Sequence, residues 1–229
     1  MIEVTLDHIM YYINEEHQTA SVFKADKDLV AGAISIPSCI TYHNQQYPIT
    51  HISNWAFKGC SGLTSVTIPD SVTSIGMFAF FGCTGLISLT IPESVRSIET
   101  CAFEECGSLT SVTIGESVTS IGDGAFAGCK SVYEITCKAV KTPDAYDSTF
   151  EEVSPHATLY VPEESIKQYK LHPVWSRFYD IQALTETETA IENTEQEVSV
   201  YPQQKVIRNG QVMILCDGDY YNMLGQKCE

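Results

Sequence analysis

The sequence predicts a mostly β solenoid, a fold in which copies of one short unit stack on one another. Two observations support this prediction: an internal period of 23 residues, and a strand-like alternation inside each period. The dipeptide Ala-Phe recurs at this spacing without a slip, and a cysteine follows each phenylalanine at a constant distance. The recurring positions are Ala56-Phe57, Ala79-Phe80, Ala102-Phe103 and Ala125-Phe126, with Cys60, Cys83, Cys106 and Cys129.

Each unit contains one clear strand segment. A 23-residue unit with about seven apolar positions cannot enclose its own hydrophobic face, whereas stacked units bury one continuous core. The alternation in Ser65-Val66-Thr67-Ile68 predicts a strand with one buried face, which ends at Pro69. We expect the strands of successive units to form a parallel ladder, and residues 72–76 to return along the opposite side. The Ala-Phe-x-Gly-Cys segment should reverse the chain as a helical or 3₁₀ turn.

The full unit reads Gly-Cys-x-x-Leu-x-Ser-Val-x-Ile-Pro-x-Ser-Val-x-Ser-Ile-Gly-x-x-Ala-Phe. It resembles the BspA-like class of leucine-rich repeat over residues 51 to about 137. The resemblance implies a right-handed leucine-rich-repeat solenoid, α/β by convention although mostly β. It also implies a bacterial protein that is secreted or surface-exposed and adheres to proteins or glycans. Three departures, Glu105 for glycine, Gly115 for proline and Cys137 for isoleucine, indicate an atypical last unit.

The chain is expected to carry a cap before the repeats. Residues 1–50 are predicted to form an amino-terminal β cap with a degenerate first repeat, and residues 51–157 the leucine-rich-repeat solenoid. Within the cap, Ile9–Ile13 and Ala20–Phe23 have the composition of strands, and Ile34–Ile36 resembles the strand of a repeat. A cap is needed because the first unit would otherwise expose its hydrophobic face to water.

A second cap is expected after the repeats, over residues 158–184. The strand-like segment Thr158–Val161 stops at Pro162, and residues 163–170 are predicted to form a short helix. Three apolar side chains at helix-like spacing should seal the last unit: Trp175, Phe178 and Ile181.

The carboxy-terminal part differs from the rest in composition. Residues 185–199 are acidic and poor in aromatic residues, which predicts a solvated linker. Residues 200–229 contain two turn signals, Asn209-Gly210 and Asp217-Gly218, beside apolar runs, which predicts a small β-meander. Its opening Val-Tyr-Pro and its Tyr-Asn-x-Leu-Gly-Gln segment resemble the sorting module of the type IX export route. A plain β appendage without a sorting role is the alternative.

Charge and hydropathy exclude two classes of partner. The chain has 13 Lys and Arg against 29 Asp and Glu, a net charge of −16, which repels phosphate backbones and anionic lipids. Nucleic acid is therefore not an expected partner. Apolar runs such as Val212–Leu215 fall far short of the ~20 residues needed to cross a bilayer, so no membrane insertion is expected.

No catalytic or metal-binding constellation stands out. The six histidines are scattered without metal-ligand spacing, Gly122-Asp123-Gly124 lacks the further glycine of a nucleotide loop, and Asp217-Gly218-Asp219 lacks the ligands of a calcium loop. The nine cysteines include no CxxC pair, and burial is the common fate of the four that repeat. The sequence predicts no catalytic, cofactor-binding or metal-binding residue, and no cofactor.

A binding surface is expected where the strand residues alternate outward, on the concave face of the ladder. Threonine is also favoured on any exposed β-face, so the same pattern suits a scaffold without a ligand. The aromatic residues near enough in sequence to strengthen binding are Phe78, Phe81, Tyr133 and Tyr146. The candidate ligand-binding residues are Ser65, Thr67, Ser88, Thr90, Ser111, Thr113, Glu134 and Thr136.

The sequence as a whole predicts a non-enzymatic binding or adhesion protein with a protein or glycan partner, such as a host surface or matrix component. The alternative is a structural spacer of a surface assembly without a ligand of its own. Secretion or display at the cell surface is expected. The segment from Met1 lacks the basic and apolar regions of a signal peptide, so a cytoplasmic location stays open.

Overall fold

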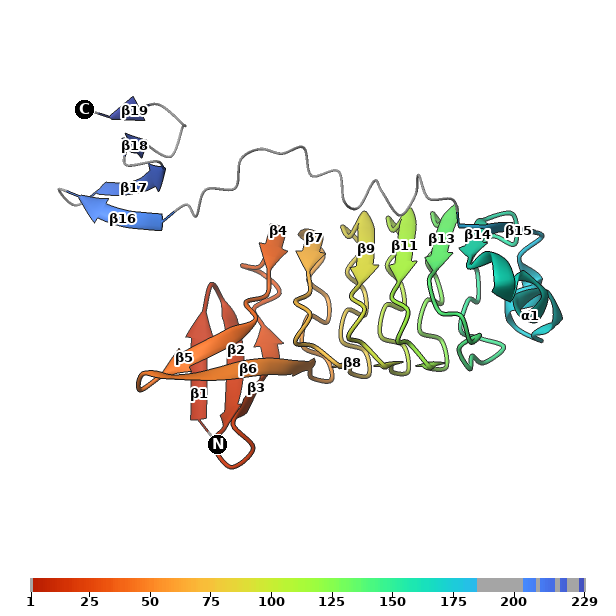
Figure 1. The fold of residues 1–229 in the computed structure, drawn as a ribbon, viewed down its shortest axis with the longest axis horizontal. Coiled ribbons are helices and arrows are strands. Elements are labelled where there is room, and N and C mark those ends of the chain that lie inside the picture. The colour runs from red at the N-terminus through yellow and green to blue at the C-terminus, as the bar shows by residue number, and fades with distance from the viewer. Residues whose placement is uncertain (1, 185–203, 209–210, 217–218, 222–226, 229) are drawn as a thin grey trace. The chain divides into compact units, whose positions relative to one another are not determined.

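The computed structural model describes residues 2–184, 204–208, 211–216, 219–221 and 227–228 (Figure 1). The chain divides into two compact units, Met1–Leu184 and Thr185–Glu229. The first unit is a stack of strand-bearing turns with a β cap at its amino-terminal end and a short helical segment at its carboxy-terminal end. The mostly β solenoid predicted from the sequence is confirmed.

The amino-terminal cap is a meander of β1 (Ile2–Leu6), β2 (Ile9–Asn14) and β3 (Thr19–Ala25). The sequence predicted the second and third of these strands but not β1. Strand β3 then pairs in parallel with β6 (Gln45–Ile52), which forms an antiparallel hairpin with β5 (Cys39–Tyr42). Both two-residue hairpin turns have positive φ at their two central residues, as type I′ turns require. These residues are Asp7 and His8 in one turn, and His43 and Asn44 in the other.

The solenoid has two parallel ladders. The first contains β9 (Ser88–Ile91), β11 (Ser111–Ile114), β13 (Glu134–Cys137), β14 (Thr158–Val161) and β15 (Asp180–Ala183). Beside it, β4 (Gly32–Ser35) pairs with β7 (Leu63–Thr67), and the bond from Ile87 N to Thr64 O, 3.1 Å, links this pair to the next unit. The second ladder continues the cap sheet from β6 through β8 (Ser74–Ile75), β10 (Ser97–Ile98) and β12 (Ser120–Ile121). The cap and the repeats therefore share one continuous sheet.

The turn that contains Ala-Phe differs from the expectation. Instead of a helix or a 3₁₀-helix, it is a chain of separate turns, such as those closed by Lys58 N to Trp55 O and by Cys60 N to Phe57 O. Trp55 and Gly59 have φ of 60° and 75°, and left-handed residues at this spacing interrupt any right-handed helix. The sequence period did not reveal the left-handed residues, because a helical turn and a chain of separate turns bury the same positions.

Two departures from the repeat pattern have different structural consequences. Glu105 adopts φ of 61° at a position where other units use a left-handed glycine, a conformation that costs a side chain about 1–2 kcal/mol, and the replacement has no structural explanation. Gly115 is buried, and a Cβ atom there would lie 2.5 Å from the carbonyl oxygen of Pro92. Proline, the usual residue, would not fit so close to the neighbouring unit. The glycines that correspond to Glu105 are Gly59, Gly82 and Gly128.

The core is a column of aligned side chains. Five phenylalanine rings stack along it, with successive centroids 4.8, 5.0, 5.4 and 5.7 Å apart and planes within 6–7° of parallel. Beside this stack, each of three cysteine thiols donates a hydrogen bond to a carbonyl of the preceding unit, as Cys83 does to Phe57 O at 3.1 Å. The predicted burial of the four repeated cysteines is confirmed. The stacked residues are Phe57, Phe80, Phe103, Phe126 and Phe150.

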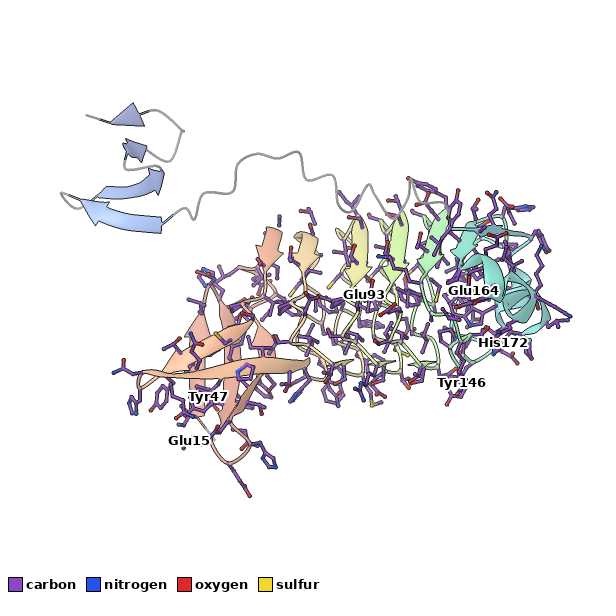
Figure 2. The ribbon with its side chains drawn as sticks, viewed as in Figure 1. Glu15, Tyr47, Glu93, Tyr146, Glu164 and His172 are labelled. Carbon is purple, nitrogen blue, oxygen red and sulfur yellow. The ribbon has the colours of Figure 1, made fainter. Side chains whose placement is uncertain are left out.

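The last unit is closed by η1 (Glu163–Ser165), α1 (Ile166–Leu171) and η2 (Trp175–Arg177), next to His172 in Figure 2. The buried Trp175 and Phe178 rings both contact Phe150, as the sequence predicted for the seal. Ile181 is buried too, but it lies in β15 and not in a helix, because the chain returns to pair with β14. In the described residues, no helix is both long and apolar enough to cross a membrane.

The second unit contains an antiparallel meander of β16 (Gln204–Arg208), β17 (Gln211–Cys216), β18 (Asp219–Tyr221) and β19 (Lys227–Cys228). This is the small β-meander that the sequence predicted. The predicted linker, residues 185–199, and both turn dipeptides lie outside the described residues. The sorting role suggested by the resemblance stays a prediction.

Candidate functional site

Six of the eight candidate residues lie on the solvent side of the first ladder, and the other two lie on the solvent side of β7 beside it. Each alternates with a buried residue of the core, such as Leu89 between Ser88 and Thr90. The register of the strand pairs aligns the outward residues in two rows across the ladder. One row contains Ser88, Ser111 and Glu134, and the other contains Thr90, Thr113 and Thr136. Ser65 and Thr67 point the same way on β7 but pair with β4.

Both rows extend beyond the predicted residues. Strand β14 places Thr158 beside Glu134 and Tyr160 beside Thr136, and β15 adds Asp180 and Gln182. We call the outward residues of β7, β9, β11, β13, β14 and β15 the ladder face. Its carboxy-terminal end is ordered by hydrogen bonds to the Asp180 carboxylate, from the Thr158 hydroxyl at 3.1 Å and from the Gln182 amide at 2.8 Å.

Sequence reasoning missed these last four positions because it assigned residues 158–184 to a cap. A signal was present, since Thr158-Leu159-Tyr160-Val161 has the same outward and inward alternation as Ser88-Leu89-Thr90-Ile91. The loss of the 23-residue spacing after residue 137 hid the continuation. Tyr160 is thus an aromatic ring on the ladder face that the list of aromatic candidates omitted.

The aromatic candidates themselves fall in different places. Tyr133, directly before β13, and Tyr146 are 62% and 60% exposed. Phe78 and Phe81 lie together on the turn side of the second unit, where the Lys58 ammonium is 6.0 and 5.2 Å from their ring centroids. The structure therefore does not bring Phe78 and Phe81 to the ladder face.

Three of the four repeated cysteines are deactivated as nucleophiles by their surroundings. Burial raises the pKa of Cys60 to about 11 and that of Cys83 to about 12. The pKa of Cys106 is also raised, first through its hydrogen bond with Cys129 and then through burial. Thiols with such pKa values stay protonated at neutral pH, and a protonated thiol is a poor nucleophile and metal ligand. Within the described residues, no group of three or more His, Cys, Asp or Glu comes together as a metal site.

The raised pKa values of the buried thiols predict alkaline sensitivity. The thiol pKa is 9.0 without burial and about 11–12 for Cys60 and Cys83 in the folded chain, so folding opposes their ionisation. Their contribution is fully present below about pH 9 and is lost as the pH rises towards 11–12. Melting temperatures measured in reducing buffer should hold to pH 9 and then fall. Cys83→Ala should show a shallower fall, and equal melting temperatures at pH 8 and 11 would contradict the assignment.

The comparisons with known proteins agree with this geometry. A family model described as the BspA type leucine rich repeat region matches residues 50–171 in six copies. A leucine-rich repeat protein from Bacteroides capillosus is 31% identical with a TM-score of 0.55, over 59% of this chain and 98% of that chain. The T. pallidum leucine-rich repeat protein has a TM-score of 0.61 at 22% identity, over 80% and 83%, and shares the fold. No curated protein matches significantly. The chain belongs to the BspA-type leucine-rich repeat family.

Proposed function

We propose that this chain is a non-enzymatic binding protein, secreted or displayed at the cell surface, which recognises a protein or glycan partner with its ladder face. The observation that carries the proposal is the alignment of outward polar side chains in two rows across successive strands. The buried column behind the rows holds their spacing, because every strand residue between them packs into the core. Family membership supports the proposal, since solenoids of this type present extended recognition surfaces.

The chemistry of the ladder face suits a polar partner. Hydroxyl groups of serine and threonine both donate and accept hydrogen bonds, so the rows offer a regular array of both kinds. The carboxylates of Glu134 and Asp180 add acceptors towards the carboxy-terminal end, where Tyr160 supplies an aromatic ring. Aromatic side chains at the centre of a contact often contribute most of the binding energy. We therefore expect the strongest contacts around β13, β14 and β15.

The test is a binding screen followed by substitutions on the ladder face. A glycan array and immobilised extracellular-matrix proteins serve as probes. For any probe that binds saturably, Thr90→Arg and Tyr160→Ala should each weaken binding at least about tenfold, which is about 1.4 kcal/mol. The matched control is Thr119→Arg, an exposed threonine beside the second ladder. Binding that survives both ladder substitutions would place the partner elsewhere.

A structural spacer without a ligand is the second candidate. It is favoured by one observation, that the rows from β7 to β13 contain only Ser, Thr and one Glu, residue types common on any solvated β-face. A complete absence of saturable binding in the screen would support the spacer. Binding lost specifically on the ladder substitutions would exclude it.

A further inference from the structure

Trp55 is a large apolar residue that lies at the surface and not in the core. It lies in the first turn after β6, its residue surface is 52% exposed, and its φ is 60°. The same position of later units has Phe78, Cys101 and Gly124, with φ between 54° and 62°. Glycine adopts this left-handed backbone without steric conflict, whereas tryptophan does not. The indole ring stacks in parallel on Phe78 of the next unit, with centroids 6.3 Å apart, yet about half of Trp55 stays exposed on a backbone conformation that tryptophan disfavours.

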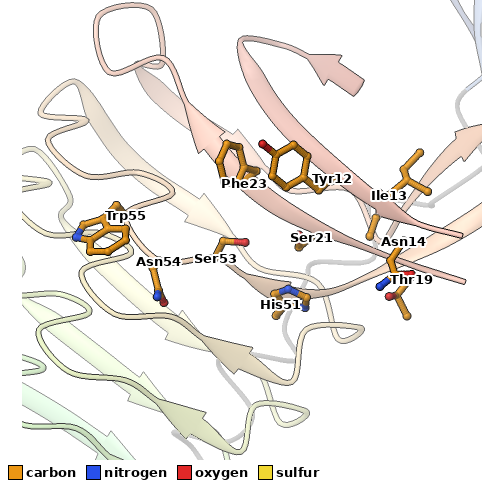
Figure 3. Close-up of a pocket in the computed structure, with 11 residues that line it drawn as sticks. Tyr12, Ile13, Asn14, Thr19, Ser21, Phe23, His51, Ser53, Asn54 and Trp55 are labelled. Carbon is orange, nitrogen blue, oxygen red and sulfur yellow. The ribbon is translucent and has the colours of Figure 1, made fainter. Parts of the chain in front are cut away.

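Two neighbouring cavities have Trp55 in their walls. One, of about 430 Å³, lies against the outer surface of the cap sheet, between Trp55 and residues of β2, β3 and β6 (Figure 3). The other, of about 780 Å³, is lined by residues around His8, Lys24 and Lys58. Volumes of ~300–1,000 Å³ are typical of small-molecule sites. Trp55 therefore belongs to a hollow of ligand size and not to an isolated surface position.

The smaller cavity is lined by neutral groups only. None of its eleven lining residues is Asp, Glu, Lys or Arg, in a chain whose net charge is −16. Burial lowers the pKa of His51, so its imidazole is neutral at pH 7. Its Nδ1 lies 3.2 Å from the Thr50 hydroxyl, which leaves Nε2 to hydrogen-bond a ligand. The Thr19 hydroxyl and the NH₂ groups of Asn14 and Asn54 add further hydrogen-bonding groups, while the two amide oxygens already accept from the backbone N–H groups of His17 and Met77. Such a lining disfavours phosphates, carboxylates and ammonium groups as ligands.

Aromatic rings form two parts of the lining. Tyr12 and Phe23 stack on each other with centroids 3.9 Å apart, while Trp55 presents its ring at one end, beside Ser53 and Asn54 (Figure 3). Flat aromatic surfaces combined with neutral hydrogen-bonding groups match the two surfaces of a sugar ring. One face of a pyranose presents C–H groups, and its rim presents hydroxyls.

A peptide strand fits this cavity poorly. Peptides that add to a sheet need an edge strand with free backbone groups. Here β2, β3 and β6, which form the floor, each have strand partners on both sides in the order β1-β2-β3-β6-β8. Recognition must therefore go through side chains, and these are the neutral polar and aromatic groups just described.

We propose that the cavity between Trp55 and the cap sheet binds a neutral saccharide, with the indole ring against the C–H face of one sugar. The neutral amide, hydroxyl and imidazole groups of the cavity hydrogen-bond the sugar hydroxyls. This saccharide site lies on the cap sheet and the first turn. It is separate from the ladder face and does not depend on the partner proposed for that face.

Tryptophan fluorescence tests the saccharide site directly. The sequence has two tryptophans, and Trp175 is fully buried, so acrylamide quenches mainly Trp55. The probes are cellopentaose, mannopentaose, xylopentaose and N-acetylchitopentaose, with pentagalacturonate as the acidic comparison. At least one neutral probe should protect Trp55 saturably, with a Kd below about 1 mM. Protection by none of the neutral probes, or equal protection by pentagalacturonate, would overturn the proposal.

Variants at Trp55 separate binding from folding. Trp55→Gly should lose affinity for the protecting saccharide at least tenfold in calorimetry. Its melting temperature should change little, because the relief of φ of 60° by glycine offsets the lost stacking on Phe78. Trp55→Phe should retain intermediate affinity. Thr90→Arg should bind the saccharide as the parent does, which distinguishes this site from the ladder face. Unchanged affinity in Trp55→Gly, or a marked fall in its melting temperature, would count against the saccharide site.

Discussion

Phe103→Ala is expected to lower the free energy of unfolding by about 3–5 kcal/mol, the usual range for a buried phenylalanine truncated to alanine. Phe103 lies in the middle of the phenylalanine stack, with ring centroids 5.0 Å from Phe80 and 5.4 Å from Phe126, and it is fully buried. Its removal leaves a gap that two rings line from opposite sides. Neither ring can close that gap, because each is fixed by its own unit.

Phe81→Ala is the control that separates loss of the ring stack from loss of any phenylalanine side chain. Phe81 undergoes the same change in side-chain volume but is only half-buried, on the turn side of the solenoid. Its loss should cost about 1 kcal/mol, in proportion to the smaller apolar area buried. Urea unfolding followed by circular dichroism measures both variants. Equal losses for Phe81→Ala and Phe103→Ala would mean that the ring stack does not form the central column of the core.

The 23-residue period predicted most of the solenoid correctly, for a physical reason. Residues that must be buried in every unit recur at fixed spacing, so Val66, Leu89 and Val112 identify strands without any knowledge of their partners. Turn geometry has no such signature. The left-handed backbone at Trp55 and Glu105 is compatible with the same buried pattern as a helix, so the sequence predicted the wrong turn.

Sites that depend on distant segments were harder to predict. The outward rows on β7 to β13 follow from alternation alone, but their extension to Asp180 and Gln182 requires β15 to return beside β14. The cavity at Trp55 requires β2 and β3 to approach the first turn, and nothing in either segment specifies that distance. The sequence shows that one position of the repeat varies, since it holds Trp55, Phe78, Cys101 and Gly124 in successive units. That Trp55 is exposed at this position is known only from the structure.

Trp175→Ala is expected to cost about 3–5 kcal/mol as well, but with its damage confined to one end. The buried indole N–H donates to the Pro143 carbonyl at 3.0 Å, and the ring lies 4.9 Å from Phe150 and 5.3 Å from Tyr169 between centroids. The truncation removes the last cover of the phenylalanine stack and leaves a buried carbonyl without its donor. An unsatisfied buried acceptor adds its own cost of about 1–3 kcal/mol.

The location of the damage follows from how solenoids are held together. Each unit contacts only its neighbours, so a lost end contact should loosen the adjacent units first. Hydrogen exchange in Trp175→Ala should therefore accelerate in β13, β14 and β15 and stay near the parent rate in β1, β2 and β3. Phe103→Ala, in the middle of the stack, should instead accelerate exchange on both sides of its unit. A uniform acceleration of exchange in both variants would show that the solenoid unfolds as one cooperative unit. In that case the caps stabilise the whole solenoid and not only the units beside them.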